Sequence, residues 1–213
     1  KKSIPLDQFI NLALYNKKTG YYMKQNPFGK AGDYITAPLV SKLFGEMIAI
    51  WCVAFWEHLG KPKKFIIAEL GPGDGSLCKD LIDTFRNFNN FYKSLEIKLL
   101  EKSFQLKKIQ KNKINNKKVK WINNIKELQS GPIIFLCNEF FDSLPIKQFY
   151  IKKKIIYEKY IGLLKGSKKM NFYYKKADKK LIKILKKLNL TYGNNVAEYP
   201  ESGINYLNTI SKK

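Results

Sequence analysis

A strand that runs into three glycines at alternate positions is the feature that most limits how this chain can fold. The strand is expected at residues 65–70, and Gly71, Gly73 and Gly75 follow it directly. A helical pattern of apolar residues begins near Ser76. Glycine lacks the Cβ that stops a backbone from turning sharply and lying against a flat ligand. A strand, a glycine turn and a helix N-terminus together predict a nucleotide-sized crevice at the carboxyl end of a sheet.

The spacing of these glycines separates several classes of nucleotide-binding protein. The pattern is G-x-G-x-G, whereas dinucleotide-binding proteins carry G-x-G-x-x-G. No Gly-Lys-Ser or Gly-Lys-Thr follows to hold a triphosphate. The motif therefore favours a nucleoside ligand without phosphates, such as S-adenosylmethionine. A glycine turn in some other α/β protein is the alternative that the motif alone leaves open.

The composition is that of a globular protein with a strongly basic surface. The chain is 45% apolar and carries a formal net charge of +23, which raises the hypothesis of a nucleic-acid partner. However, Arg86 is the only arginine, and the other 39 basic residues are lysines. Arginine is the residue that reads bases and grips phosphates with paired hydrogen bonds. We interpret the lysines as a solvated surface encoded by an AT-rich genome, which disfavours nucleic acid as a partner.

Four apolar segments alternate with helical or irregular segments in the middle of the chain. The expected strands are residues 65–70, 96–102, 119–122 and 132–140. Their Ile, Val, Leu and Phe content suits a parallel sheet covered on both faces. Helices near residues 77–88 and 103–112 would supply right-handed crossovers. The sequence therefore predicts an α/β fold with a Rossmann-like sheet.

The regions on either side of this core have a different character. Residues 5–15 and 40–59 have helical spacing, and a long polar and aromatic loop separates them. After Pro145, strand-like segments predict an antiparallel meander, followed by an amphipathic helix and a last strand end and helix; these are residues 149–153, 155–163, 170–175, 178–188 and 198–210. We divide the chain into an N-terminal helical segment with a cofactor-covering loop, a Rossmann-like core, and a small meander and helix insertion, at residues 1–60, 61–146 and 147–213.

Two acidic residues lie at strand ends beside the glycine turn. Glu101 closes the second strand, where a carboxylate can accept hydrogen bonds from both ribose hydroxyls of an adenosine. Along the sequence, Glu101 follows Gly71 by more than the roughly 20 residues that usually separate the glycine turn from such an acidic residue. An inserted loop at residues 87–92 accounts for the extra residues. An ordinary surface glutamate is the alternative. Glu69, directly before the turn, is either a ligand for the methionine ammonium or an anchor for the loop backbone.

Two carboxylates flank two phenylalanines at the end of the fourth strand. They are Glu139 and Asp142, with Phe140 and Phe141 between them. Carboxylates and aromatic faces together bind a guanidinium or ammonium group, through forked hydrogen bonds and cation–π contact. We therefore predict Glu139 and Asp142 as catalytic residues acting on a cationic side chain. A capping Asp142 with core phenylalanines is the structural alternative.

The sequence shows neither a pattern of metal ligands nor an apolar segment long enough to span a membrane. The three cysteines, Cys52, Cys78 and Cys137, have no spacing typical of metal ligands, and His58 is the only histidine. No apolar run approaches the roughly 20 residues that span a bilayer. We expect no metal site and no membrane insertion.

Six stretches of sequence occur together and in order over roughly the first 150 residues. They are residues 20–22, 27–29, 32–38, 44–47, 69–75 and 138–145. In this combination the chain resembles the MidA-like methyltransferases, whose mitochondrial members are arginine methyltransferases that assist assembly of respiratory complex I. The resemblance implies a class I methyltransferase sheet. Because such a sheet normally needs about seven strands, we expect this one to be truncated at the C-terminus.

The resemblance also implies a set of cofactor-binding residues. S-adenosylmethionine would be bound by Gly71, Gly73, Gly75 and Glu101, to which we add Glu69 and Asn138. Three residues of the N-terminal loop would close over the cofactor: Gly32, Asp33 and Thr36.

We therefore predict an S-adenosylmethionine-dependent protein methyltransferase that modifies an arginine of a respiratory complex I type subunit. Glu139 and Asp142 would hold the guanidinium and accept its proton around the transfer step. An RNA methyltransferase and a non-catalytic assembly factor that keeps the fold are the alternatives. The composition favours a bacterial cytoplasm, with a mitochondrial matrix as the second possibility.

Overall fold

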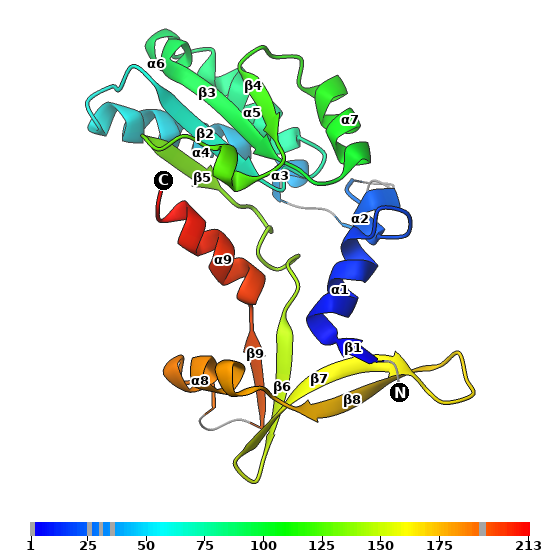
Figure 1. The fold of residues 1–213 in the computed structure, drawn as a ribbon. Coiled ribbons are helices and arrows are strands. Elements are labelled where there is room, and N and C mark those ends of the chain that lie inside the picture. Colours follow the sequence, from blue (N-terminus) through cyan, green and yellow to red (C-terminus); the bar gives the residue numbers. More distant parts are fainter. Residues whose placement is uncertain (1–2, 25–26, 30–31, 35–36, 192–194) are drawn as a thin grey trace.

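The computed structural model describes residues 3–24, 27–29, 32–34, 37–191 and 195–213. These residues form two sheets, one above the other in Figure 1. The upper sheet contains β2 (Phe65–Leu70), β3 (Leu95–Leu100), β4 (Val119–Ile122) and β5 (Ile133–Leu136). The lower sheet contains β1 (Ser3–Pro5), β6 (Lys147–Lys152), β7 (Ile155–Leu163), β8 (Met170–Lys176) and β9 (Val196–Tyr199). The helices are α1 (Leu6–Tyr15), α2 (Tyr21–Lys24), α3 (Ala37–Val40), α4 (Lys42–His58), α5 (Ser76–Phe85), α6 (Asn89–Ser94), α7 (Phe104–Lys113), the 3-10 turn η1 (Ile125–Glu127), α8 (Lys179–Lys187) and α9 (Glu201–Ile210).

The upper sheet is parallel, with strand order β4-β3-β2-β5. Alternate residues of its strands enter two separate cores, because successive side chains of a strand point to opposite faces. Ile67, Leu99 and Ile134 pack with α4, α5 and α6 in one core, and Ala68 and Leu100 pack with η1 and α9 in the other. The predicted α/β fold with a parallel sheet is confirmed.

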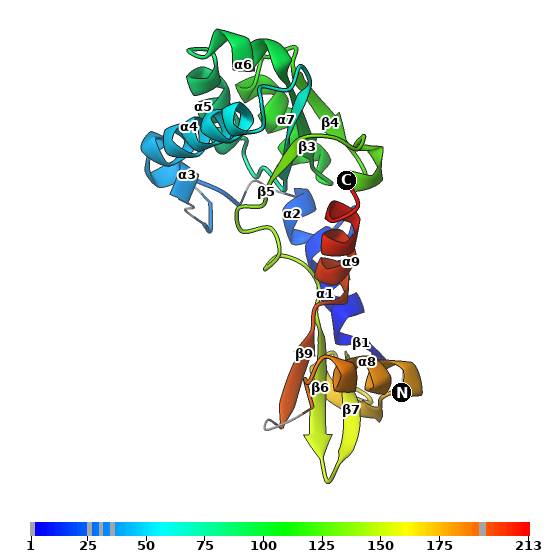
Figure 2. The ribbon, with the colours of Figure 1, turned by 90° about the vertical axis from the view of Figure 1, so that its left-hand side faces the viewer.

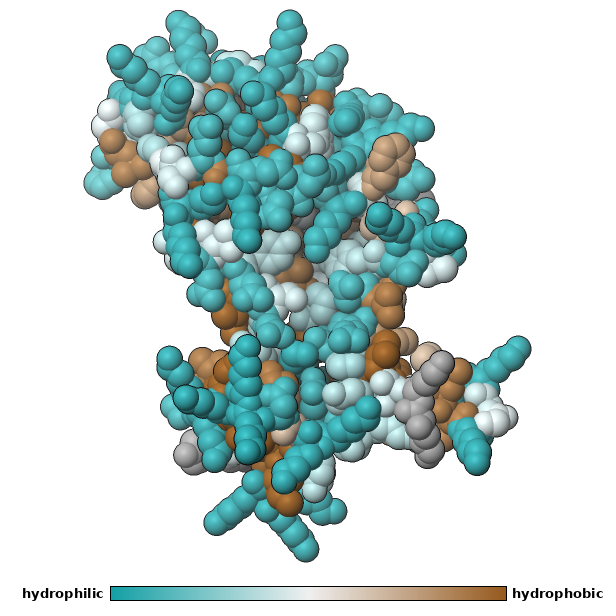
Figure 3. All heavy atoms as spheres, viewed as in Figure 1, coloured by the Kyte–Doolittle hydropathy of each residue, from teal (hydrophilic) through white to brown (hydrophobic). Residues whose placement is uncertain are grey.

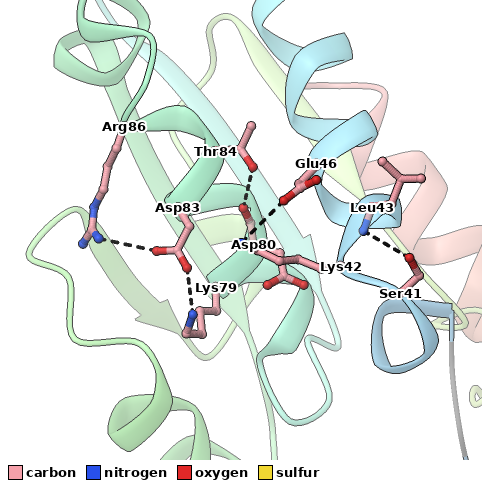
Figure 4. A network of polar contacts seen from close by, with 9 residues as sticks. All are labelled: Ser41, Lys42, Leu43, Glu46, Lys79, Asp80, Asp83, Thr84 and Arg86. Atoms are coloured by element: carbon pink, nitrogen blue, oxygen red, sulfur yellow. Dashed lines mark hydrogen bonds and ion pairs between the residues drawn. The ribbon is translucent and has the colours of Figure 1, made fainter.

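The helices α4 and α5 cover one face of this sheet side by side (Figure 4). Ala49, Cys52 and Val53 of α4 and Leu81 of α5 are buried between the helices and the strands. On the solvent-facing side of these helices, ion pairs join Lys42 to Glu46 on α4, and join Lys79 and Arg86 to Asp83 on α5. Exposed pairs contribute at most about 1 kcal/mol each, so the buried apolar face, with side chains worth about 1.5–3 kcal/mol each, holds α4 and α5 in place.

The lower sheet is antiparallel, as the predicted meander requires. The strands β6, β7 and β8 pair in sequence, and β9 returns along β6. Phe149 of this sheet packs in one core with Leu181 and Leu185 of α8. The helix begins after Asp178, whose side chain accepts a hydrogen bond from the Leu181 backbone N–H at 2.8 Å. Ser3–Pro5 adds the strand β1 to β7, and the helix predicted from residue 5 begins at Leu6.

In Figures 1 and 2, α1, α2 and α9 lie between the two sheets, beside the segment that joins β5 to β6. Lys147 of β6 joins these parts, because its ammonium lies 2.8 Å from the carboxylate of Asp7, 3.4 Å from that of Glu158 and 3.8 Å from that of Glu201. The α9 end is also tied to the upper sheet, since the Lys213 carbonyl accepts the Gly131 backbone N–H at 3.1 Å. These contacts tie α1 and α9 to the lower sheet through Lys147, and they tie the residues after α9 to the segment just before β5.

Three local predictions are corrected by the structure. The fourth strand ends at Leu136 rather than at residue 140, and residues 138–143 form a turn. The expected loop at residues 87–92 instead leads into the helix α6, because Phe91 is buried among Phe65, Phe85 and Trp56. The long N-terminal loop contains the short helices α2 and α3.

Hydrophilic side chains project over most of the face seen in Figure 3. None of the helices in the described residues combines the length and apolar character needed to cross a membrane.

Candidate active site

A cavity of about 260 Å³ opens at the carboxyl ends of β2 and β3 and at the turn after β5. In a sheet of order β4-β3-β2-β5 the connections reverse between β2 and β5, and ligands bind at such a switch point. The volume is near the lower end of the range for small-molecule sites, about 300 to 1,000 Å³. Seven predicted residues line it together: Glu69, Gly71, Gly73, Glu101, Asn138, Glu139 and Asp142.

The glycine turn needs glycine for both its backbone and its surroundings. Gly71 and Gly73 have φ of +68° and +56°, in the left-handed region that other residues rarely adopt. A Cβ on Gly71 would lie 2.8 Å from the Phe140 ring, and one on Gly73 would lie 3.4 Å from the Phe28 ring. Side-chain-free backbone is therefore exposed to the cavity between these two aromatic rings.

Gly75 occupies a different place from the other two glycines. It caps the N-terminus of α5 with φ of +84° and is absent from the described cavity lining. A Cβ there would lie 2.9 Å from the Ile114 side chain and 3.2 Å from that of Gln110. The structure thus explains this glycine by close packing against α7, and its predicted contact with a cofactor stays a prediction.

Glu69 lines the cavity, and one oxygen of its buried carboxyl group has no hydrogen-bond partner among the described residues. The residue is 3% exposed, and this oxygen is Oε2. Burial is the main cause that raises the pKa of Glu69 to about 8, and the nearby carboxylates of Asp74 and Glu101 add to it. An orphaned buried carboxyl oxygen is rare in folded proteins, which favours the predicted role as a ligand for a cation over that of a loop anchor.

This burial predicts a pH-dependent cost to stability. Because the pKa of Glu69 is raised on folding, the unfolded chain ionises near pH 4.5 while the folded chain holds the proton until about pH 8. Glu69 therefore does not lower the free energy of unfolding below about pH 4.5. Between about pH 4.5 and about pH 8, it lowers the free energy of unfolding by about 1.4 kcal/mol for each pH unit. We expect Glu69→Gln to remove this loss, so that its free energy of unfolding exceeds that of the wild type more at pH 8 than at pH 5. Urea unfolding of both proteins at the two pH values measures the difference, and equal differences would contradict it.

Glu101 is held in place by hydrogen bonds from the Ser103 backbone, the Gln110 side chain and the Lys102 backbone. Its Oε1 accepts from the Ser103 backbone N–H at 2.8 Å, and its Oε2 accepts from the Gln110 side-chain amide at 3.2 Å. Burial raises its pKa, and the hydrogen bonds from Ser103, Gln110 and the Lys102 backbone oppose that shift. Each carboxylate oxygen can accept a second hydrogen bond, so Glu101 keeps acceptor capacity toward the cavity that it lines.

The turn after β5 carries the two predicted catalytic carboxylates. Glu139 and Asp142 are exposed and line the cavity, and Glu139 has φ of +47°. A left-handed glutamate is uncommon, and such backbone strain clusters at functional sites. Ser143 holds the turn, because its hydroxyl donates to the Phe140 carbonyl at 2.7 Å and accepts from the Tyr15 hydroxyl at 3.1 Å.

The N-terminal loop contributes to the cavity through residues other than the predicted ones. Asp33 accepts a hydrogen bond from the Tyr21 hydroxyl, and a Cβ on Gly32 would lie 2.4 Å from the Pro27 carbonyl. Neither residue is part of the described lining, where the loop instead supplies Phe28 and Tyr34. Thr36 lies outside the described residues. The loop reaches the cavity, but the predicted closure over the cofactor stays a prediction.

The sequence analysis named Phe140 at this site but missed three tyrosines that line the cavity, Tyr15, Tyr22 and Tyr206. Tyr15 and Tyr22 stack with ring centroids 5.6 Å apart, and Tyr206 contacts Phe140 edge-on at 5.0 Å. All four residues line the cavity. The pair of adjacent tyrosines in the N-terminal loop was a usable signal, whereas nothing in the local pattern of α9 indicates that Tyr206 reaches a site near residue 140.

Comparison with known proteins places the chain in a family. The sequence model of the family described as "Putative S-adenosyl-L-methionine-dependent methyltransferase" matches residues 47–213. The chain belongs to this family. The predicted methyltransferase family is thereby confirmed, with S-adenosylmethionine as the cofactor that the family description gives.

Curated proteins that are similar in sequence to this chain carry a more specific name. Protein arginine methyltransferase NDUFAF7, mitochondrial, from Xenopus laevis is 32% identical over 167 residues, which cover 67% of this chain and 38% of that protein. The human protein of the same name is 30% identical over 170 residues, covering 68% of this chain and 38% of that protein. The chain therefore spans less than two fifths of the length of these curated relatives.

Solved structures share the fold. A protein from Burkholderia thailandensis, solved bound to S-adenosyl-homocysteine, has a TM-score of 0.81 and 20% identity, covering 98% of this chain and 55% of that one. A second structure from the same organism has a TM-score of 0.77 and 18% identity, covering 98% of this chain and 53% of that one.

Within the residues that the structure describes, no group of three or more His, Cys, Asp or Glu side chains could hold a metal ion.

Proposed function

We propose that this chain binds S-adenosylmethionine in the cavity at the ends of β2, β3 and β5 and transfers its methyl group to a protein arginine. The observation that carries the proposal is the meeting of a glycine turn and the buried carboxyls of Glu69 and Glu101 at the switch point of the sheet. Membership of the methyltransferase family supports the cofactor. The name of the relatives supports arginine as the acceptor.

The residues present fit this cofactor. Glu69 offers an unpaired carboxyl oxygen for an ammonium group. Gly71 and Gly73 would leave room for a flat ligand, because both line the cavity and neither has a side chain. Glu101 would accept the ribose hydroxyls, and Asn138 would add an amide at the opposite wall. When bound, S-adenosylmethionine supplies a methyl group on a sulfonium, which leaves as a neutral thioether.

The mouth of the cavity suits a cationic acceptor. Glu139 and Asp142 are exposed carboxylates that would hold a guanidinium by forked hydrogen bonds and bias its charge toward one nitrogen. Glu139 would accept the proton that the guanidinium loses as the new N–C bond forms. The Tyr15 ring already faces a cation, since the Lys102 ammonium lies 5.2 Å from its centroid. Burial raises the pKa of Tyr22 to about 12, so its hydroxyl stays neutral beside these charges.

The finer assignments extend this proposal. The resemblance to the MidA-like methyltransferases points to a subunit of respiratory complex I as the protein that carries the arginine. The relatives are named as mitochondrial proteins, which supports a mitochondrial matrix, while the lysine-rich composition supports a bacterial cytoplasm.

Transfer of labelled methyl groups tests the proposal. The full chain is incubated with tritiated S-adenosylmethionine and an arginine-containing peptide, with the same peptide carrying lysine in place of arginine as control. We expect label only on the arginine peptide. Cofactor binding without transfer to any polypeptide of a lysate would support a non-catalytic assembly factor instead. Label in RNA that is lost between low and moderate salt would support RNA methylation.

A further inference from the structure

Gln110 of α7 is a fully buried polar side chain that no part of the proposed reaction uses. It is 0% exposed and makes three hydrogen bonds to three different elements. Its amide nitrogen donates to the Gly73 carbonyl at 2.8 Å and to the Glu101 Oε2 at 3.2 Å. Its amide oxygen accepts from the Trp121 indole N–H at 2.8 Å. One side chain thus joins the glycine turn, the end of β3 and the strand β4.

The chemistry of these partners fixes the orientation of the amide. The Gly73 carbonyl and the Glu101 carboxylate only accept hydrogen bonds, and the Trp121 indole N–H only donates. A side chain with two N–H donors on one end and an acceptor on the other is required, and glutamine has this arrangement at the length that the site allows. Glutamate at this position would bring its own carboxylate against the Gly73 carbonyl and the Glu101 carboxylate, which are also acceptors. Methionine has no N–H to donate to either of these two groups.

The third glycine of the motif makes this contact possible. A Cβ on Gly75 would lie 3.2 Å from the Gln110 Cγ and 2.9 Å from the Ile114 side chain. Without a side chain at Gly75, α7 approaches the turn closely enough for Gln110 to reach the Gly73 carbonyl. A second contact reinforces the approach, because the Lys113 ammonium pairs with the Asp74 carboxylate and lies 2.8 Å from the Ser76 hydroxyl.

The geometry points to Gln110 as the positioning residue that sets the selectivity of this site for a ribonucleoside, by holding the Glu101 carboxylate in register with the glycine turn. The inference rests on the proposed cofactor function and names a specificity residue for it. The other donors to the Glu101 carboxylate are backbone groups of the residues that follow it, Lys102 and Ser103. Loss of Gln110 would free the Oε2 side, so that the carboxylate no longer faces the two sugar hydroxyls in a fixed direction.

A comparison of two ligands separates this role from a general structural one. The probes are S-adenosylhomocysteine and the same compound lacking both ribose hydroxyls, and the readout is the ratio of their dissociation constants by calorimetry. Because a hydrogen bond to a charged group is a strong one, we expect the wild type to prefer the ribose form by at least about tenfold. Gln110→Met should cut this preference at least about fivefold, because it removes the hydrogen bond that orients the Glu101 carboxylate toward the ribose hydroxyls. The matched control is Gln105→Met, which changes an exposed glutamine of the same helix and should leave the ratio unaltered.

Each outcome has a distinct meaning. If Gln110→Met weakens both ligands by the same factor, the residue is merely structural and the inference is overturned. If the Gln110 variant does not fold, Trp121→Phe serves instead, because it keeps an aromatic ring at this position while removing the indole N–H that anchors the Gln110 amide oxygen. A ratio that is unchanged in Trp121→Phe would overturn the inference as well. A wild type that binds both ligands equally overturns the inference alone, whereas one that binds neither overturns the proposed cofactor function too.

Discussion

Replacing Glu139 by glutamine is expected to leave cofactor affinity within about twofold of the wild type and to lower methyl transfer by about three orders of magnitude. General base catalysis contributes typically about 10² to 10⁴ in rate. Glutamine keeps the size and shape of the side chain but carries no charge and cannot accept the proton of the guanidinium. Calorimetry with S-adenosylhomocysteine measures the affinity, and single-turnover transfer from labelled cofactor to an arginine peptide measures the rate.

The position of Glu139 explains why the two effects should separate. The residue lies on the turn after β5, exposed at the mouth of the cavity, whereas Glu69 and Glu101 are buried deeper beside the glycine turn. Its backbone stays in the left-handed region, with φ of +47°, because the Ser143 hydroxyl, itself bonded by Tyr15, holds the turn through the Phe140 carbonyl. A change confined to the carboxylate should therefore not disturb the turn.

Glu57→Gln is the control for this substitution. Glu57 is an exposed carboxylate at the end of α4 that pairs only with Lys61 among the described ion pairs, and its loss should leave both affinity and rate unaltered. Full transfer activity in Glu139→Gln would remove the residue from the proposed mechanism. A parallel fall in cofactor affinity and rate would instead assign it to binding.

The parts of the site that were predicted from the sequence depend on local patterns. The glycines at alternate positions after an apolar strand indicated the turn, and the alternation of strands and helices placed Glu69 and Glu101 at the same edge of a parallel sheet. Parallel strands bring their carboxyl ends together whatever their exact lengths. Glu139 therefore reached the cavity although the strand before it ends at Leu136, earlier than predicted.

The parts that were missed depend on contacts between segments far apart in the chain. Tyr206 reaches the cavity only because α9 returns to the upper sheet, and no local period of α9 indicates that return. Gln110 lies on a lysine-rich helix where a glutamine is expected to face solvent, yet it is fully buried because Gly75 lets α7 approach. The strand β1 likewise exists only through pairing with β7. Such non-local contacts carry no signal in a single sequence window.

The largest loss of cofactor binding is expected from Gly73→Leu, which should lower affinity by at least about 100-fold, or about 2.8 kcal/mol. The backbone of Gly73 has φ of +56°, and its Cβ would lie 3.4 Å from the Phe28 ring that covers the cavity. The longer leucine side chain would have to enter the space between the turn and this ring. Calorimetric titration with S-adenosylhomocysteine measures the effect.

A glycine elsewhere in the chain separates blockage of the cavity from backbone strain. Gly166 lies in the turn between β7 and β8, with φ of +74° and no atom within 4 Å of an added Cβ. Gly166→Leu should therefore carry the same left-handed penalty of about 1–2 kcal/mol in urea unfolding, while its cofactor affinity stays that of the wild type. If Gly73→Leu is destabilised as much as Gly166→Leu but still binds cofactor normally, the ligand does not lie against this turn. Loss of affinity in Gly73→Leu alone would place it there.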